Sequence, residues 1–239
     1  MKVVISAAGK GTRMLHLTNN KSKVLINVRK RPFLFYVLKN LQKAGFSDII
    51  IVVGYKQEKF REFLRNFGFK AKLVNQFEIL GEEEYGTLCP LKCIKDIVGK
   101  ENFLMLCGDN LYSVKDLKNF NIADNLNYIA GLRHKHPEKY GVLVSKNGFL
   151  EQIVEKPKKF VGDLINTGLY KFTPEIFEKI PQIHLSPRGE YELTDAISLL
   201  ASERKVKIKE IEDYWLDFGN PGDIIKMCRF LKEHGNFKD

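Results

Sequence analysis

Short apolar runs alternate with amphipathic stretches over the first 110 residues of the chain. The β-branched run Val3-Val4-Ile5 predicts a buried strand over 2–7. Further apolar runs predict strands over 48–53, 70–74 and 102–107. Apolar residues at helical spacing predict helices over 32–44, 56–66 and 87–97. Strands that alternate with helices indicate a parallel sheet, and ligands bind such sheets at the carboxyl ends of the strands.

The pattern changes after Gly108, where shorter alternating segments follow. Asn147-Gly148 is typical of a hairpin turn. Strands are predicted over 127–132, 141–145, 149–154 and 164–172, and we expect them to form a small added lid. Helical signals return at 173–175, over 190–201 and over 221–234, with strands over 205–210 and up to 217. The expected fold class is α/β: a Rossmann-like mixed, mostly parallel sheet with flanking helices and a small β lid.

Composition narrows the class of protein. The chain has 239 residues, 44% of them apolar, and no Pro/Gly/Ser-rich linker, so we expect a single domain over 1–239. It has no 18-residue apolar run and no signal-peptide pattern, which predicts a soluble, cytoplasmic protein with no membrane partner. The net charge of +10 is spread along the chain without a nucleic-acid-binding motif, so we expect anionic substrates and no nucleic acid. The four cysteines lack metal-ligand spacing and are expected to be reduced.

A glycine-rich segment follows the first expected strand. Gly9 and Gly11 permit a turn that exposes consecutive N–H groups, which form a concavity suited to an anion. Arg13 and Lys23 add positive charge to the same region of the sequence. A glycine turn after a strand is often only a turn, but these two cations favour a phosphate-binding loop. The ligand that this pairing predicts is a nucleoside triphosphate.

Two aspartates lie where apolar segments end. Asp109 follows Gly108 and the strand expected over 102–107, which places it at the ligand-binding edge of the sheet. Asp217 lies between Leu216 and Phe218, and burial of its charge without a partner would be costly. Mg²⁺ takes one or two carboxylates together with water and phosphate oxygens, so this pair is suited to hold one ion. Each aspartate could otherwise be a helix cap or a hydrogen-bonded turn residue.

These features belong to a longer series of motifs. In chain order the motifs are Ala7 to Arg13, Lys23-Val24-Leu25 with Arg31-Pro32, Gly86-Thr87, Gly108-Asp109-Asn110, Tyr140-Gly141-Val142, Glu155-Lys156-Pro157, Asn166 to Tyr170, Arg188 to Asp195, and Trp215 to Gly219. With this series the chain resembles the sugar-nucleotide pyrophosphorylases, which are sugar-1-phosphate nucleotidyltransferases of the glucose-1-phosphate thymidylyltransferase and uridylyltransferase type. The resemblance spans nearly the whole chain.

The resemblance implies a reaction. A nucleotidyl group would pass from a nucleoside triphosphate, with UTP or dTTP favoured, to a hexose-1-phosphate, with glucose-1-phosphate favoured. The products would be a nucleoside diphosphate sugar and pyrophosphate, and Mg²⁺ would assist an in-line attack. Residues 1–112 would form the nucleotide-binding half and residues 113–239 the sugar-binding half of the domain.

The resemblance also implies roles for individual residues. The nucleotide would be bound by Ala8, Gly9, Gly11, Thr12, Arg13, Lys23, Gln76, Gly86, Thr87 and Asp109. The sugar would be bound by Gly141, Glu155, Lys156 and Asn166. The metal ligands would be Asp109 and Asp217. The catalytic residues would be Arg13, Lys23, Asp109, Lys156 and Asp217.

Several alternatives stay open at this point. On the same fold, the substrates could be GTP with mannose-1-phosphate or CTP with choline phosphate, and a non-catalytic regulatory subunit could bind nucleotide sugars without turnover. The segment Glu155-Lys156-Pro157 could be a surface turn, and Asn166-Thr167-Gly168 a bulge. The acidic segment 190–195 could simply begin a helix. The sequence leaves open whether a second copy of the chain is a partner.

Overall fold

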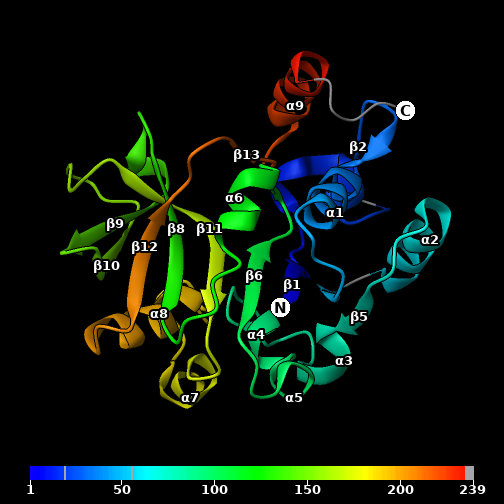
Figure 1. Cartoon of the computed structure of the whole chain (residues 1–239). Coiled ribbons are helices and arrows are strands. Elements are labelled where there is room, and N and C mark those ends of the chain that lie inside the picture. The colour runs from blue at the N-terminus through cyan, green and yellow to red at the C-terminus, as the bar shows by residue number, and fades with distance from the viewer. Residues whose placement is uncertain (19, 55, 235–239) are drawn as a thin grey trace.

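A nine-stranded sheet runs through the computed structural model, which describes residues 1–18, 20–54 and 56–234 (Figure 1). The strands lie in the order β5-β4-β1-β6-β11-β8-β12-β10-β9. In that order their bounds are Lys72–Asn75, Ile49–Val53, Lys2–Ala7, Phe103–Cys107, Leu164–Phe172, Asn127–Arg133, Val206–Glu210, Phe149–Glu155 and Gly141–Lys146. Two small sheets pair β13 (Trp215–Asp217) with β7 (Asn110–Tyr112), and β2 (Asn27–Val28) with β3 (Arg31–Pro32).

Strand direction divides the large sheet into two halves. β5, β4, β1 and β6 are parallel, with Val4 opposite both Ile50 and Met105. β11 is antiparallel to both β6 and β8, so β8 runs in the same direction as β6. β12 is parallel to β8. The carboxyl ends of β1, β4, β6, β8 and β12 therefore share one edge, and the alternation of strands and helices in the sequence predicted this arrangement for the first half.

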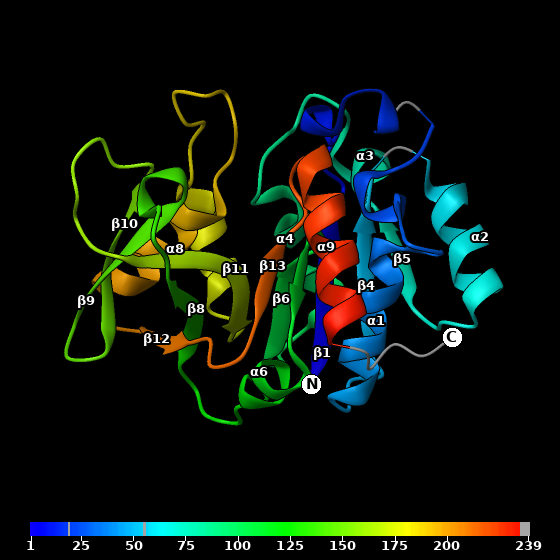
Figure 2. The same ribbon diagram turned by 90° about the horizontal axis from the view of Figure 1, so that it is seen from above.

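The strands expected to form a lid are continuous with the large sheet. Beyond β6 the order continues through β11, β8, β12, β10 and β9. β9 also pairs with β11, where Ile165 lies opposite Val142, so these five strands close into a ring (Figure 2). The prediction of a lid is therefore replaced by a second half of the same sheet. A strand edge without a partner leaves backbone groups unpaired, and the ring supplies such partners.

Helices cover both faces of the sheet. One face packs against α1 (Phe33–Lys43), α2 (Gln57–Phe67), α6 (Val114–Asn119) and α9 (Pro221–Glu233). The other packs against α4 (Cys89–Lys92), α5 (Lys95–Val98), α7 (Ile176–Lys179) and α8 (Leu193–Ser202). The remaining helices are α3 (Gln76–Leu80) and the 3₁₀ helices η1 (Thr12–Thr18), η2 (Lys23–Leu25), η3 (Pro137–Lys139) and η4 (Ile180–Gln182). Side chains of β1 alternate between the two cores, since Val3 and Ile5 belong to one and Val4 to the other.

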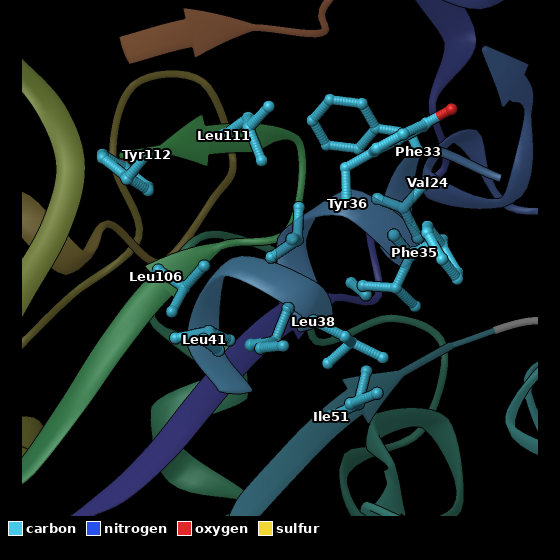
Figure 3. Close-up of a cluster of buried hydrophobic side chains, with 14 of the residues drawn as sticks. Val24, Phe33, Phe35, Tyr36, Leu38, Leu41, Ile51, Leu106, Leu111 and Tyr112 are labelled. Atoms are coloured by element: carbon cyan, nitrogen blue, oxygen red, sulfur yellow. The ribbon is translucent and has the colours of Figure 1, made fainter. Parts of the chain in front are cut away.

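Helix α1 packs against elements from both the N-terminal and the C-terminal parts of the chain. Its apolar face packs on β1, β4 and β6 in the core shown in Figure 3. Phe33, Leu34, Leu38 and Leu41 have no exposed surface, and each such side chain contributes roughly 1.5–3 kcal/mol by its burial. The Phe33 ring stacks on Phe218 with 4.4 Å between ring centroids. This contact fixes the turn after β13 against the N-terminal half.

Two predicted helices begin later than expected, and both starts lie beside one backbone pairing. The stretch 87–97 forms α4 and α5 with a break at Cys93 and Ile94, and the stretch 190–201 becomes helical only at Leu193. The backbone of Tyr191 is paired with the segment before α4. Its N–H donates to the Tyr85 carbonyl at 3.0 Å, and its carbonyl accepts from Leu88 N at 3.0 Å. Because Tyr191 is held in this pairing, the helix cannot begin before it.

The cysteines agree with the expectation from composition. Cys89, Cys93, Cys107 and Cys228 are all free thiols. Among the helices of the described residues, none has both the length and the apolar character that a membrane span requires.

Candidate active site

The glycine-rich loop after β1 approaches the start of η2 closely. Gly11 has φ +66°, a conformation that side chains other than glycine rarely adopt. A Cβ on Gly11 would lie 3.0 Å from the Lys23 Cβ and 3.1 Å from the Thr18 Cγ2. Glycine at this position therefore allows the loop to pack directly against Lys23. The structure brings together the glycine and the lysine that the sequence selected.

A cavity of about 460 Å³ opens beside this loop, at the carboxyl ends of β1 and β6. The predicted site residues that line it are Gly9, Gly11, Thr12, Arg13, Lys23, Thr87, Asp109 and Lys156. Arg188 adds a further cation to the lining. Because these cations face one cavity, its chemistry is suited to a ligand with several negative charges.

Asp109 lies at the centre of this arrangement and pairs with the ammonium of Lys23. Its position follows from the end of β6, which packs tightly against β1. Gly108 N donates to the Ser6 carbonyl at 2.8 Å, and a Cβ on Gly108 would lie 2.8 Å from the same oxygen. Only a glycine fits there, so Asp109 emerges next to the glycine-rich loop.

Asp217 reaches the same place from the opposite end of the chain. β13 pairs with β7 so that Asp217 lies opposite Asn110, and Phe218 N donates to the Asp109 carbonyl at 2.8 Å. Burial, together with the negative charges of Asp109 and Asp223, raises the pKa of Asp217 to about 6. The charges of Lys23 and Arg13 act in the opposite direction. Two carboxylates separated by 108 positions in sequence are thus electrostatic neighbours.

The donor set at this point suits Mg²⁺. Carboxylate oxygens are hard donors, and a divalent cation relieves the repulsion between Asp109 and Asp217 that contributes to the raised pKa of Asp217. Over 1–18, 20–54 and 56–234, no group of three or more His, Cys, Asp or Glu side chains could hold a metal ion. A pair of carboxylates instead fits an ion that completes its shell with water and phosphate oxygens.

Three predicted sugar-binding residues lie together on the ring of strands. A Cβ on Gly141 would lie 3.0 Å from the Glu155 Oε2 and 3.9 Å from the Asn166 Cβ. Lys156 follows Glu155, and its Nζ lies 3.9 Å from the Glu155 Oε1. Asn166 donates to the Tyr170 hydroxyl at 2.9 Å and accepts from Gly168 N at 3.0 Å. Of this group only Lys156 lines the cavity.

Other predicted residues lie outside the cavity lining. Ala8 lines a smaller neighbouring cavity of about 240 Å³. Gln76 begins α3, is 1% exposed, and its Oε1 has no hydrogen-bond partner among the described residues. A Cβ on Gly86 would lie 2.2 Å from the Tyr191 carbonyl oxygen, so backbone packing alone requires that glycine. Asp217 itself does not line the cavity, but Gly219 does. A Cβ on Gly219 would lie 3.2 Å from the Asp217 Oδ2, so the Asp217 carboxylate lies directly beside the cavity lining.

Sequence reasoning did not assign roles to several residues that line the cavity. Tyr85 is one, and its hydroxyl accepts from Lys10 N at 3.3 Å while the Lys10 ammonium lies 5.1 Å from its ring centroid. Arg188 is another, held by the buried Glu192 carboxylate at 2.7 Å. Arg188 belongs to a motif of the resemblance, which was the available signal. For Tyr85 the sequence offered no signal.

The fold and the cavity define an α/β protein that gathers a glycine loop, basic side chains and carboxylates at the carboxyl ends of its strands. The chain belongs to the nucleotidyl transferase family, whose family model matches residues 2–234. This membership confirms the family that the motif series indicated.

Relatives of known name are similar over nearly the whole chain. A bifunctional sugar-1-phosphate nucleotidylyltransferase/acetyltransferase of Sulfurisphaera tokodaii is 33% identical, over 100% of this chain and 59% of that protein. The UTP–glucose-1-phosphate uridylyltransferase AglF of Haloferax volcanii is 31% identical, over 98% and 97%. A mannose-1-phosphate guanyltransferase of Saccharomyces cerevisiae is 33% identical, over 94% and 63%. The chain thus spans little more than half the length of the bifunctional relative.

A solved structure agrees on the fold. The crystal structure of a UDP-glucose pyrophosphorylase complexed with UDP-glucose has a TM-score of 0.84 to this chain and covers 98% of both chains. The sequence identity is 20%, so this likeness concerns the fold alone. It confirms the α/β class with a mixed sheet and flanking helices.

Proposed function

We propose that this protein is a sugar-1-phosphate nucleotidyltransferase that joins a nucleoside triphosphate to a hexose-1-phosphate. We favour UTP or dTTP as the nucleotide and glucose-1-phosphate as the sugar. The observation that carries the proposal is the cavity of about 460 Å³ lined by Arg13, Lys23 and Lys156 together with Asp109, whose carboxylate pairs with Lys23. A transfer between two phosphorylated substrates needs this concentration of positive charge more than it needs a general base.

In the proposed reaction, an oxygen of the sugar phosphate attacks the α-phosphorus of the triphosphate. A phosphorus–oxygen bond to the sugar phosphate forms as the bond to the β-phosphate breaks, and pyrophosphate leaves. The amides of Gly9, Gly11 and Thr12, with Arg13, would bind the triphosphate. Lys23 would neutralise the phosphate under attack, and Lys156 the incoming sugar phosphate. Holding both substrates in line is itself a large part of the acceleration.

Asp109 and Asp217 would hold Mg²⁺, together with phosphate oxygens of the nucleotide. The ion would supply neutralisation of the charge that develops on the phosphates. The protein's own part is to keep both carboxylates in place, through the pairing of β13 with β7 and the hydrogen bond from Phe218 N to the Asp109 carbonyl.

The two substrates would be distinguished in different halves of the protein. Gln76 would read the base with its unpartnered Oε1, and Gly86 and Thr87 would also contact the nucleotide. The N3–H group of uracil or thymine would donate a hydrogen bond to the Gln76 Oε1, a buried acceptor that has no other partner among the described residues. Glu155, Asn166 and the backbone at Gly141 would bind sugar hydroxyls. Relatives that act on mannose-1-phosphate with GTP are as similar as those that act on glucose-1-phosphate with UTP, so the panel of substrates must include both.

The test is a matrix assay of pyrophosphate release. Purified protein is mixed with Mg²⁺, each of UTP, dTTP, CTP, GTP and ATP, and either glucose-1-phosphate, mannose-1-phosphate or choline phosphate. We expect turnover with UTP or dTTP and glucose-1-phosphate, and its loss when EDTA removes the metal. The Asp217→Asn variant should lose turnover, whereas Lys30→Ala, which removes an exposed lysine of the β2–β3 turn, should keep it. Binding of a nucleotide sugar with no turnover for any pair would instead indicate a regulatory subunit.

A further inference from the structure

A second, larger cavity lies outside the proposed active site. It has a volume of about 540 Å³ and is formed between the segments 133–138 and 157–163. The first segment follows β8 and the second connects β10 to β11. None of the residues proposed for the transfer reaction lines it.

This cavity lies at the carboxyl end of β8. β8 runs in the same direction as β6, because β11 is antiparallel to both. The end of β8 therefore lies at the same edge as the ends of β1 and β6, the edge at which α/β sheets bind ligands. Lys156 lines the first cavity and Pro157 lines the second, so the two cavities are neighbours along one loop.

The base of the cavity is well fixed. His134 N donates to the Asp163 carbonyl at 2.8 Å, which ties the two segments together. Arg133 pairs with the Asp163 carboxylate at 2.9 Å and with Glu210 at 3.3 Å, so its charge is compensated. Glu138 lies 3.5 Å from the ring nitrogen of His136. The Asp163 carboxylate at the cavity is thus already paired with a cation.

Three other lysines keep uncompensated charge. Lys135, Lys158 and Lys159 line the cavity, and within the described part of the chain none of them makes an ion pair. Beside them the ring of Phe160 is 80% exposed, and Val161 is 43% exposed. Lysine ammonium groups bind phosphates as point charges, and an exposed aromatic ring stacks on a nucleobase. Charge and ring together match a ligand that has both a phosphate and a base.

We propose that this cavity is a second nucleotide-binding site, distinct from the proposed active site. The phosphates contact Lys135, Lys158 and Lys159, and the base stacks on Phe160. Two sources share this chemistry: a free nucleoside triphosphate and a nucleoside diphosphate sugar. The proposal does not depend on transferase activity.

The test is a binding titration by calorimetry with four probes, in the absence of added metal. The probes are UTP, dTTP, UDP-glucose and inorganic pyrophosphate. The Lys158→Ala/Lys159→Ala/Phe160→Ala variant alters only exposed side chains, and its matched control is Lys70→Ala/Lys72→Ala near β5. Arg13→Ala separates the two sites, since it removes a cation of the first cavity alone.

We expect a binding event that persists in Arg13→Ala and in the lysine control, and that weakens at least tenfold in the triple variant. Phe160→Ala alone should weaken nucleotide binding while leaving pyrophosphate binding unchanged. The stronger of the triphosphate and UDP-glucose identifies the source. Binding that is equally strong in the triple variant and the wild type, or no event in Arg13→Ala, would overturn the proposal. Both results are independent of whether any substrate pair turns over.

Discussion

The two halves of the large sheet contribute to the cavity by different means. In the parallel half, glycines at the ends of β1 and β6 allow backbone to approach backbone, and Lys23 and Asp109 meet beside them. In the ring of β11, β8, β12, β10 and β9, the candidate contacts are side chains of neighbouring strands, such as Glu155 and Asn166. Backbone amides and a lysine suit phosphates, which all nucleotides share, whereas side chains on strands suit the hydroxyl pattern of one sugar. Changes in the parallel half should therefore reduce rate, and changes in the ring should alter substrate preference.

The largest effect should come from Lys23→Ala in the parallel half. Loss of a group that stabilises charge in the transition state commonly lowers the rate about 10²- to 10³-fold. Pyrophosphate release under saturating substrates measures this change. Lys30→Ala, an exposed lysine seven positions further along the chain, is the control and should retain the wild-type rate. A normal rate in Lys23→Ala would remove the proposed role of this residue.

The next largest effect, on stability, is expected at the contact between α6 and the segment that links β12 to β13. Asp116 on α6 is 1% exposed and accepts hydrogen bonds from Glu212 N at 2.8 Å and Asp213 N at 3.2 Å, in the segment that links β12 to β13. Asp116→Ala leaves these amides without their acceptor and should lower the free energy of unfolding by about 2 kcal/mol.

Chemical denaturation measures the change in Asp116→Ala, and Asp116→Asn, which keeps one acceptor oxygen, should be less destabilised. Equal stability of Asp116→Ala and the wild type would mean that the segment is held by other contacts.

A smaller and more selective effect is expected within the ring. Glu155→Gln keeps the shape of the side chain but removes its charge, and should raise KM for the sugar phosphate about tenfold, the equivalent of about 1.4 kcal/mol. KM for the nucleotide should not change. Steady-state kinetics with each substrate varied in turn measures both constants. Glu151→Gln on the same strand is the control, and a parallel rise in both KM values would contradict the division of labour between the halves.

The smallest effect concerns an ion pair between α7 and the end of α8, remote from the cavity. Hydrogen bonds from Lys179 and Lys205 lower the pKa of Glu203 in the folded protein. Such a carboxylate stabilises the fold above its unfolded pKa, and this contribution is lost as the pH falls through the lowered folded value. Lys179→Met should therefore reduce Tm slightly at pH 7, and the difference from wild type should shrink below about pH 4. Thermal melts across this pH range measure it, and a difference that grows toward low pH would contradict the assignment.

The fold was predictable where local pattern decides structure. β1 and α1 lie within a residue or two of their expected bounds, because β-branched runs and helical spacing act over neighbouring residues. The ring was not predictable as such, since alternation shows that a strand has two different faces but not which edge it joins. The late start of α8 depends on the pairing of Tyr191 with Tyr85 and Leu88, more than 100 residues away.

The candidate site divides in the same way. Gly11 and Asp109 could be selected because each follows a strand or a glycine at one edge of the sheet, and Lys23 because it adds a cation soon after the glycine-rich loop. Tyr85 could not, since its contact with Lys10 arises only when the segment before α4 folds back over the loop. Gln76 was selected from the resemblance, and its burial with an unpartnered oxygen is a property that no sequence pattern displays.

The closed ring leaves few sheet edges at which two copies of the chain could pair in a concentrated solution. Because β9 turns back onto β11, the large sheet offers β5 as its outer strand at the other end. β5 has four residues and carries the exposed Lys72, and short charged edges resist aggregation by intermolecular strand pairing. The protein thus limits self-association at the sheet edges, through geometry at one end and charge repulsion at the other.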